Sequence, residues 1–229
     1  MMAAIYDEQY ARRYRDRDDQ LDAVGSYQEL VRWIGGVCDR FGRPIDVLDL
    51  GCGTGRYFWG LRHVNTLTGL DASAPMLAEA RFPTHADRIR AGRIELINGD
   101  LARHQFPNGS FDLVYSIGVL AEHVPLNRSL VERVAGWLKP GGRFAFTTVD
   151  PRSPDVPKTL ARRIASAMLP ALPGDAGRRL HERLMAGGMY GDARWIRQQL
   201  DGLFTIESLE HYQSDVHLHG RCVARKVTA

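Results

Sequence analysis

The chain has 229 residues, of which 44% are hydrophobic and 25% are charged. This composition is ordinary for a globular protein, and the length allows one substantial core but is short for two full domains. The formal net charge of +3 is too small an excess to indicate a nucleic-acid-binding surface, which usually shows clustered basic residues.

Cysteine usage and the lack of long apolar segments favour a cytoplasmic location. Cys38, Cys52 and Cys222 form no pair with metal-site spacing, so we interpret them as thiols in a reducing compartment. The first residues lack a cationic start followed by a long apolar run, and no apolar stretch reaches the length of a membrane-spanning helix. We therefore expect no signal peptide and no membrane span.

Residues 1–43 are expected to form N-terminal helices. Within 6–22, three aromatic side chains recur every four positions, so one helical face would be aromatic: Tyr6, Tyr10 and Tyr14. Ser26 with Glu29 has the pattern of a capping box. It introduces a second helix whose apolar face consists of Leu30, Ile34, Val37 and Phe41.

Residues 44–150 alternate short apolar runs with amphipathic stretches. The expected strands are Ile45–Leu50, Leu67–Leu70, Ile94–Asn98, Phe111–Ser116 and Arg143–Val149. Helices are expected from Arg56, after Ser73 as an N-cap, and through Leu130 to Leu138. This alternation predicts a mostly parallel sheet that is covered on both faces.

The alternation of apolar runs with amphipathic stretches ends after Asp150. Residues 151–191 are proline-containing and are expected to form a helical insertion. Residues 192–229 should hold a last helix from about Asp192 and an antiparallel pair of strands near Phe204–Glu210 and His217–Val227. The whole chain is therefore predicted to be one α/β domain.

The glycine-rich turn after the first strand carries the first functional signal. Its glycines, Gly51, Gly53 and Gly55, let the backbone turn tightly and approach a ligand closely. A following helix N-terminus would present free N–H groups to an anionic group. The spacing is not that of a dinucleotide-binding loop, because Arg56 stands where its third glycine would be. Taken alone, the turn has the alternative explanation of a tight strand–helix connection.

Polar residues end three further strands in order. Asp71 ends the second strand, where a carboxylate suits the two hydroxyls of a ribose. Asp100 follows the third strand and could accept from the exocyclic amine of a purine, and Ser116 ends the fourth. A single exposed Asp is usually a loop or cap residue. Two such carboxylates in order after a glycine loop indicate a ligand site at the carboxyl edge of the sheet.

These segments together resemble the class I S-adenosylmethionine-dependent methyltransferases, in the branch that includes quinone-biosynthesis and natural-product enzymes. The resemblance covers residues 45–150 and rests on Val47–Gly55, Gly69–Ser73 with Met76-Leu77, Gly99-Asp100, Phe111–Val114 and Leu138–Gly142. It implies a Rossmann-like three-layer αβα sandwich with a seven-stranded, mostly parallel sheet and an antiparallel last strand. In this arrangement, 44–150 would be the cofactor-binding core and 151–191 a lid.

The resemblance also implies a role for each matching residue. Gly51 and Gly53 would pass close to the methionine part of S-adenosylmethionine, and Asp49 would help to hold its amino group. Asp71 would take the ribose hydroxyls, Asp100 and the Leu101 backbone the adenine, and the Ser116 carbonyl the amine. The expected cofactor-binding set is Asp49, Gly51, Cys52, Gly53, Gly55, Asp71, Ala72, Asp100, Leu101 and Ser116.

Glu122 and His123 are the candidate catalytic residues, because they lie just past the fourth strand. Methyl transfer needs a base only when the nucleophile still carries its proton. The alternative is a polar pair at a helix start that faces solvent. Some relatives that methylate catechols bind a metal here, but this chain has Val119 in place of one ligand. We therefore expect no metal.

The acceptor should be chosen outside residues 45–150. Candidate acceptor-binding residues are Tyr10, Tyr14, Arg179, Arg183 and Tyr190. The 151–191 segment is more basic than acidic, which favours an acidic acceptor, although its arginines could equally be a solvated helix face. His217 and His219 lie two apart on a predicted strand, as metal ligands could, but no third ligand completes a recognisable set.

The predicted function is transfer of the methyl group of S-adenosylmethionine to a small-molecule acceptor, at a hydroxyl or activated carbon, by in-line displacement. We expect a monomer or homodimer. A nucleic-acid adenine methyltransferase would need an Asn/Asp-Pro-Pro-aromatic tetrapeptide after the fourth strand, and Ser116–Val119 is not one. A non-catalytic cofactor-binding module and a methyltransferase acting on protein or nucleic acid stay open as alternatives.

Overall fold

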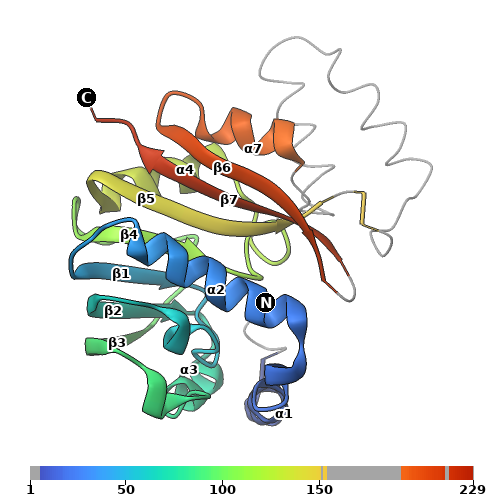
Figure 1. Cartoon of the computed structure of the whole chain (residues 1–229). Coiled ribbons are helices and arrows are strands. Elements are labelled where there is room, and N and C mark those ends of the chain that lie inside the picture. Colours follow the sequence, from blue (N-terminus) through green and yellow to red (C-terminus); the bar gives the residue numbers. More distant parts are fainter. Residues whose placement is uncertain (1–5, 151, 154–191, 215–216, 229) are drawn as a thin grey trace.

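A computed structural model describes residues 6–150, 152–153, 192–214 and 217–228 of the chain. Its centre is a seven-stranded sheet in the order β3-β2-β1-β4-β5-β7-β6 (Figure 1). The strands are β1 Ile45–Leu50, β2 Val64–Asp71, β3 Ala91–Asn98, β4 Phe111–Ser116, β5 Leu138–Val149, β6 Phe204–Gln213 and β7 Leu218–Lys226. The five expected core strands and the closing pair are confirmed.

Strand direction follows the prediction. β1 to β5 pair in parallel, and β7 runs antiparallel to both β5 and β6. β5 begins earlier than expected, at Leu138, directly after the helix before it. Lys139 explains the difference, because its ammonium lies 2.7 Å from Asp46 and 2.8 Å from Asp112 and fixes this segment beside β1 and β4.

Helices cover both faces of the sheet. The helices are α1 Glu8–Asp18, α2 Gly25–Asp39, α3 Ala74–Ala80, α4 Arg128–Trp137 and α7 Ala193–Leu200. Side chains of α4 and α7 pack with Leu50 and Phe146 in one core, whereas α2 packs with Val47 and Ala145 in the other. α2 lies across the front of the sheet in Figure 1. The predicted three-layer αβα sandwich is confirmed, and no helix among the described residues is long and apolar enough to span a membrane.

The expected helix from Arg56 is wrong. The glycine turn leads instead into one short 3₁₀ turn, Phe58–Gly60, before β2. α2 already occupies this face so closely that a Cβ on Gly60 would lie 3.0 Å from a Val31 methyl carbon, and a Cβ on Gly35 would lie 2.9 Å from the Gly60 carbonyl oxygen. A full helix has no room between α2 and the sheet.

The predicted capping box is also absent. α2 begins at Gly25 after a 3₁₀ turn, Leu21–Ala23, and no side chain caps its first N–H groups. Glu29 does not fold back toward Ser26, because its carboxylate pairs with Arg221 of β7 at 2.6 Å. By contrast, Ser73 caps α3 as expected, its hydroxyl accepting from the Met76 N–H.

Candidate functional site

A cleft of about 730 Å³ opens at the carboxyl ends of β1, β2, β3 and β4. Volumes of about 300–1,000 Å³ are typical of small-molecule sites. Four loops that follow these strands line it, at 51–54, 71–73, 98–102 and 117–119, and the tyrosines of the N-terminal segment cover it. The structure therefore brings the predicted carboxylates Asp49, Asp71 and Asp100 into one site.

Gly51 and Gly53 of the first loop are required to be glycine for different structural reasons. The backbones of both Gly51 and Gly53 are left-handed, with φ of 77° and 56°. A Cβ on Gly51 would lie 2.5 Å from a methyl carbon of Val119, so packing requires this glycine. A Cβ on Gly53 would meet only the flexible end of Met76, at 3.3 Å. Gly53 therefore leaves space in the cleft itself, where a ligand can approach the backbone.

Asp71 holds the glycine loop against the end of β2. Its carboxylate accepts from the N–H of Gly53 at 2.9 Å and from the N–H of Ser73 at 2.8 Å. Burial raises the pKa of Asp71, and these backbone donors oppose that rise. A carboxylate has about four acceptor positions, so this side chain can accept further hydrogen bonds from a ligand.

Asp49 lies at the floor of the cleft. It is buried, and its carboxylate accepts from the Tyr115 hydroxyl at 2.5 Å. Burial raises the pKa of Asp49 to about 8. The group is therefore largely protonated at neutral pH, and a cation bound beside it would favour its ionised form.

The remaining predicted cofactor residues divide into two groups. Asp100 and Leu101 line the cleft, and the Asp100 carboxylate accepts from the Ala102 N–H at 2.8 Å; Cys52 and Ala72 also line it. Ser116 and Gly55 do not line the cleft. Ser116 is fully buried and its hydroxyl donates to the Leu50 carbonyl at 2.8 Å, whereas Ile117, Gly118 and Val119 form the wall beyond it.

The aromatic stripe of the N-terminal segment forms the roof of the cleft. Tyr6 and Tyr10 contact edge to face, with ring centroids 5.0 Å apart, and Tyr10 stacks on Tyr14 at 5.9 Å. All three line the cleft, which includes the predicted acceptor-binding residues Tyr10 and Tyr14. The other three predicted acceptor-binding residues lie outside the described residues: Arg179, Arg183 and Tyr190. Nearly all of the 151–191 segment lies outside them as well.

A buried ion pair fastens this roof to the glycine loop. Asp18, only 1% exposed at the end of α1, accepts from Arg56 Nε at 2.6 Å and from the Thr54 hydroxyl. The Arg56 guanidinium lies 4.2 Å from the ring centroid of Tyr14. Sequence reasoning did not find Asp18, although it continues the aromatic stripe one helical turn beyond Tyr14.

Glu122 and His123 occupy a tight turn, not a helix start. The N–H groups of His123 and Val124 both donate to the Val119 carbonyl, at 2.8 and 3.1 Å, and Ala121 is held at a φ of 59°. α4 begins later, at Arg128, with Asn127 as its N-cap. The predicted helix start is therefore wrong, but the solvent-facing part of that alternative holds for His123, which is exposed, while Glu122 is half-buried.

The two side chains of this turn have different neighbours. His123 lines the cleft, with Nε2 3.5 Å from the Tyr6 hydroxyl, and burial lowers its pKa. The Glu122 carboxylate lies instead beside His219 of β7, with Oε1 3.8 Å from Nδ1. Burial raises the pKa of Glu122 to about 7.

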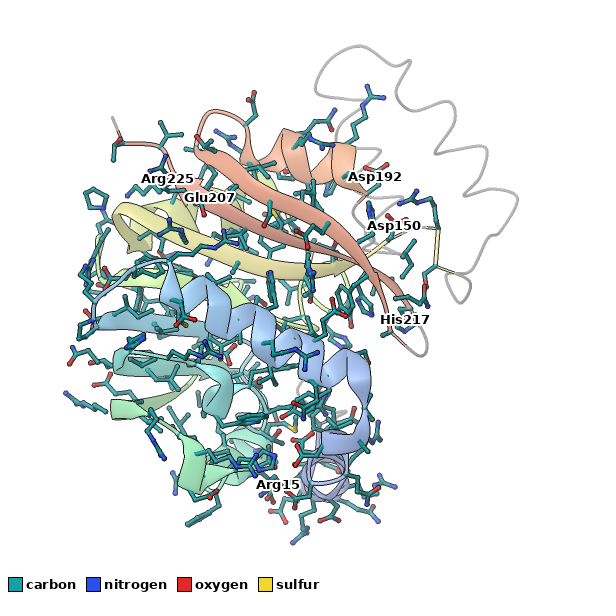
Figure 2. The ribbon with its side chains drawn as sticks, in the orientation of Figure 1. Arg15, Asp150, Asp192, Glu207, His217 and Arg225 are labelled. Atoms are coloured by element: carbon teal, nitrogen blue, oxygen red, sulfur yellow. The ribbon has the colours of Figure 1, made fainter. Side chains whose placement is uncertain are left out.

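The other histidines form no recognisable metal centre. Asp150 and His217 lie at the end of the sheet where β5 ends and β7 begins, opposite Glu207 and Arg225 (Figure 2). His211 pairs with Asp150 at 3.0 Å. Among the described residues, no group of three or more His, Cys, Asp or Glu side chains could hold a metal ion.

Comparison with known proteins agrees with this geometry. Residues 47–142 match a family described as a methyltransferase domain. This segment is thus similar to a methyltransferase domain. Two solved structures share its fold. A methyltransferase from Mesorhizobium loti described as S-adenosylmethionine dependent has 27% identity and a TM-score of 0.54, covering 80% of this chain and 92% of that one. The N-methyltransferase NodS from Bradyrhizobium japonicum, in complex with S-adenosyl-L-homocysteine, has 17% identity and a TM-score of 0.63, covering 95% and 99%.

Two curated relatives of this chain have names from quinone biosynthesis. The demethylmenaquinone methyltransferase of Listeria monocytogenes is 32% identical over 148 residues, which are 61% of this chain and 59% of that protein. The ubiquinone biosynthesis O-methyltransferase of Cronobacter sakazakii is 32% identical over 139 residues, 56% and 55% respectively. The match thus spans little more than half the length of these relatives.

Proposed function

We propose that this chain binds S-adenosylmethionine in the cleft and transfers its methyl group to a small-molecule acceptor. One observation carries the proposal: the glycine loop, Asp71, Asp100 and His123 come from different parts of the sequence and line one cleft. This cleft lies at the carboxyl edge of a parallel sheet, where α/β proteins bind ligands.

The residues present fit the cofactor. Asp71 retains acceptor capacity for ribose hydroxyls, and Asp100 lies on the next loop, where the adenine would be held. Asp49 lies at the floor, where a cationic amino group would favour its ionised form. The space beside Gly53 would be filled by any larger residue. Each role is the one that the sequence resemblance implies.

S-adenosylmethionine supplies a methyl group on a sulfonium, which is already a strong electrophile. The chain's own contribution is to orient the acceptor and to exclude water, since proximity and orientation alone can lower a barrier by about 7–11 kcal/mol. The tyrosine roof, formed by Tyr6, Tyr10 and Tyr14, lines the cleft and would contribute to both.

His123 is the proposed proton acceptor. Its pKa is lowered, so the imidazole is neutral near pH 7 and one of its two ring nitrogens can accept a proton. The neighbouring Tyr6 hydroxyl, 3.5 Å away, can hold the ring in place. A base of this kind assists a hydroxyl or an acidic carbon more than a thiol, which is more nucleophilic unaided.

An aromatic acceptor suits the cleft best. The names of the two quinone-biosynthesis relatives support a phenolic or quinol-like acceptor, and aromatic rings pack favourably against tyrosine side chains. The three cysteines, all buried thiols, are consistent with a cytoplasmic location. Methylation of a protein or nucleic acid, and cofactor binding without turnover, are the alternatives.

A turnover assay tests the proposal. The purified chain is incubated with methyl-labelled S-adenosylmethionine and a panel of phenols, catechols and quinols, and products are detected by mass. A labelled product that appears together with S-adenosylhomocysteine, and is lost in His123→Ala, is the expected result. Cofactor binding without any methylated panel member would favour the non-catalytic alternative.

A further inference from the structure

One end of the tyrosine roof already binds cations of the chain itself. The Arg56 guanidinium lies 4.2 Å from the centroid of the Tyr14 ring, and the Arg17 guanidinium lies 5.9 Å from it. A cation within about 6 Å of an aromatic centroid is attracted by the negative face of the ring. The chain therefore supplies its own cations to Tyr14.

The other two rings of the roof form a corner on the cleft. Tyr6 and Tyr10 stand perpendicular, with planes at 89° and centroids 5.0 Å apart, and both line the cleft. No Arg or Lys side chain in the described part of the chain lies over either ring. The corner is therefore available to a cation that arrives with a ligand.

The charges around this corner favour a positive ligand. Three carboxyl side chains line the cleft: Asp49, Asp71 and Asp100. Among the described lining residues, Arg56 is the one Arg or Lys, and its charge is paired with Asp18 at 2.6 Å. Burial, and to a smaller extent neighbouring groups, raise the pKa of Tyr6 to about 12, so its ring stays uncharged at neutral pH. A bound cation would thus meet carboxyl groups and neutral ring faces.

The corner lies between the two parts of the site proposed for the cofactor. At one end of the roof, Tyr14 contacts Arg56, which follows the glycine loop. At the other end, the Tyr6 carbonyl accepts from the Ser73 hydroxyl at 2.9 Å, on the loop that begins with Asp71. The glycine loop is the proposed site of the amino-acid part of S-adenosylmethionine, and Asp71 that of its ribose. The sulfonium joins these two parts, so it would lie under the roof between Tyr14 and Tyr6.

We propose that the ring faces of Tyr6 and Tyr10 bind the sulfonium of S-adenosylmethionine and thereby distinguish the charged donor from the uncharged thioether product. This inference rests on the proposed function of the cleft. Methyl transfer breaks the bond between sulfur and the methyl carbon, and its electron pair stays on sulfur, which becomes neutral. The attraction between cation and ring is therefore present before transfer and lost after it. The two rings would favour donor binding and product release, while His123 accepts the proton.

The test compares the affinities of two ligands for the same protein. Calorimetry without an acceptor gives the Kd of S-adenosylmethionine and of S-adenosylhomocysteine in the wild type, Tyr6→Leu and Tyr10→Leu. We expect each substitution to weaken binding of the donor, relative to that of the product, by about three- to thirtyfold, the range of one cation–π contact. Tyr10→Phe keeps the ring and should keep the wild-type ratio.

Two controls separate recognition of charge from effects of shape and folding. An analogue in which a methylated carbon replaces the methylated sulfur has the shape of the donor without its charge, and its affinity relative to the product should not change in Tyr10→Leu. Phe82→Leu alters an aromatic side chain that is 78% exposed and does not line the cleft, and should leave the ratio unchanged. Tyr6 precedes α1 and Tyr10 lies within it, so their Leu variants are independent measurements.

Three results would overturn the inference. The first is an unchanged ratio in both Leu variants. The second is a ratio that falls as far in Tyr10→Phe as in Tyr10→Leu, which would assign the effect to the hydroxyl. The third is an equal loss for the donor and its carbon analogue, which would show that the rings recognise the methyl group and not the charge. Failure of the wild type to bind either form of the cofactor would instead contradict the proposed function itself.

Discussion

The Tyr6 hydroxyl lies 3.5 Å from Nε2 of His123, although 117 positions separate the two residues in the sequence. Their rings meet edge to face, with centroids 6.1 Å apart. The contact joins the segment before α1 to the turn after β4 and closes one side of the cleft. Burial raises the pKa of Tyr6 to about 12, so its hydroxyl remains a hydrogen-bond donor at neutral pH.

Removing the proposed base should slow turnover without affecting cofactor binding. His123→Ala is expected to lower kcat by about 10²–10⁴, the usual contribution of a positioned general base. Tyr6→Phe should cause a smaller loss, because the ring contact remains and only the hydroxyl is removed. Steady-state kinetics on an acceptor found in the turnover assay, with calorimetry of S-adenosylhomocysteine as control, provide the measurement. A near-normal kcat in His123→Ala would remove this residue from the mechanism.

The buried pair between Asp18 and Arg56 should hold α1 over the cleft. Asp18→Asn leaves the Arg56 charge without its partner, and breaking a buried ion pair costs about 3–5 kcal/mol. We expect a lower Tm and faster tryptic cleavage within α1, which contains several arginines. Asp16→Asn, at an exposed position of the same helix, is the matched control. Equal cleavage rates in the two variants would show that the pair does not fasten the helix.

Cofactor affinity should depend on pH through Asp49. Its pKa is about 8 in the folded protein, so binding of a cationic amino group at pH 7 must release a proton. Affinity for S-adenosylhomocysteine should therefore rise between pH 6 and pH 8, by up to about tenfold for each pH unit. Calorimetry in buffers of different ionisation enthalpy detects the released proton. Asp49→Asn should bind with a flat pH profile, and an equal slope in that variant would exclude Asp49 as the titrating group.

Glu122 should make the protein less stable as pH rises. The pKa of its carboxyl is about 7 in the fold, against an ordinary value of 4.5, so folding favours the protonated form. The stabilisation is present below about pH 4.5 and is lost as pH rises through 7, a change of about 3 kcal/mol at most. The difference in unfolding free energy between Glu122→Gln and the wild type should therefore grow in favour of the variant from pH 5 to pH 7.5. Urea unfolding at both pH values measures it, and parallel pH profiles would contradict the assignment.

Local sequence patterns were sufficient to predict the sheet and the carboxylates that line the cleft at the ends of its strands. β1 and β4 are short, mostly apolar runs in which almost every residue is buried, so their bounds follow from the sequence alone. Asp71 and Asp100 follow strands that lie at one edge of a parallel sheet, so their shared cleft was also predictable. Ser73 as an N-cap depends on a local hydrogen bond and was correct.

Features that depend on distant packing could not be predicted in the same way. The helix expected from Arg56 is excluded by α2, a segment earlier in the chain, and the Glu29 side chain is drawn to Arg221 near the other terminus. The position of the Glu122 carboxylate beside His219 depends on the antiparallel return of β7. No periodicity in the sequence encodes these contacts, because each joins elements that only the tertiary fold brings together.

The most direct test of the account is the affinity of the chain for S-adenosylhomocysteine, compared with NAD, in the wild type and in Asp71→Ala. We predict that the wild type binds S-adenosylhomocysteine in preference to NAD. Asp71→Ala should weaken this binding by about ten- to a hundredfold, since hydrogen bonds to a charged group contribute about 1.5–3 kcal/mol each. Asp87→Ala, an exposed carboxylate outside the cleft, should have no effect. A chain that prefers NAD, or that binds S-adenosylhomocysteine equally well in both variants, would contradict the assignment of this cleft as a methyl-donor site.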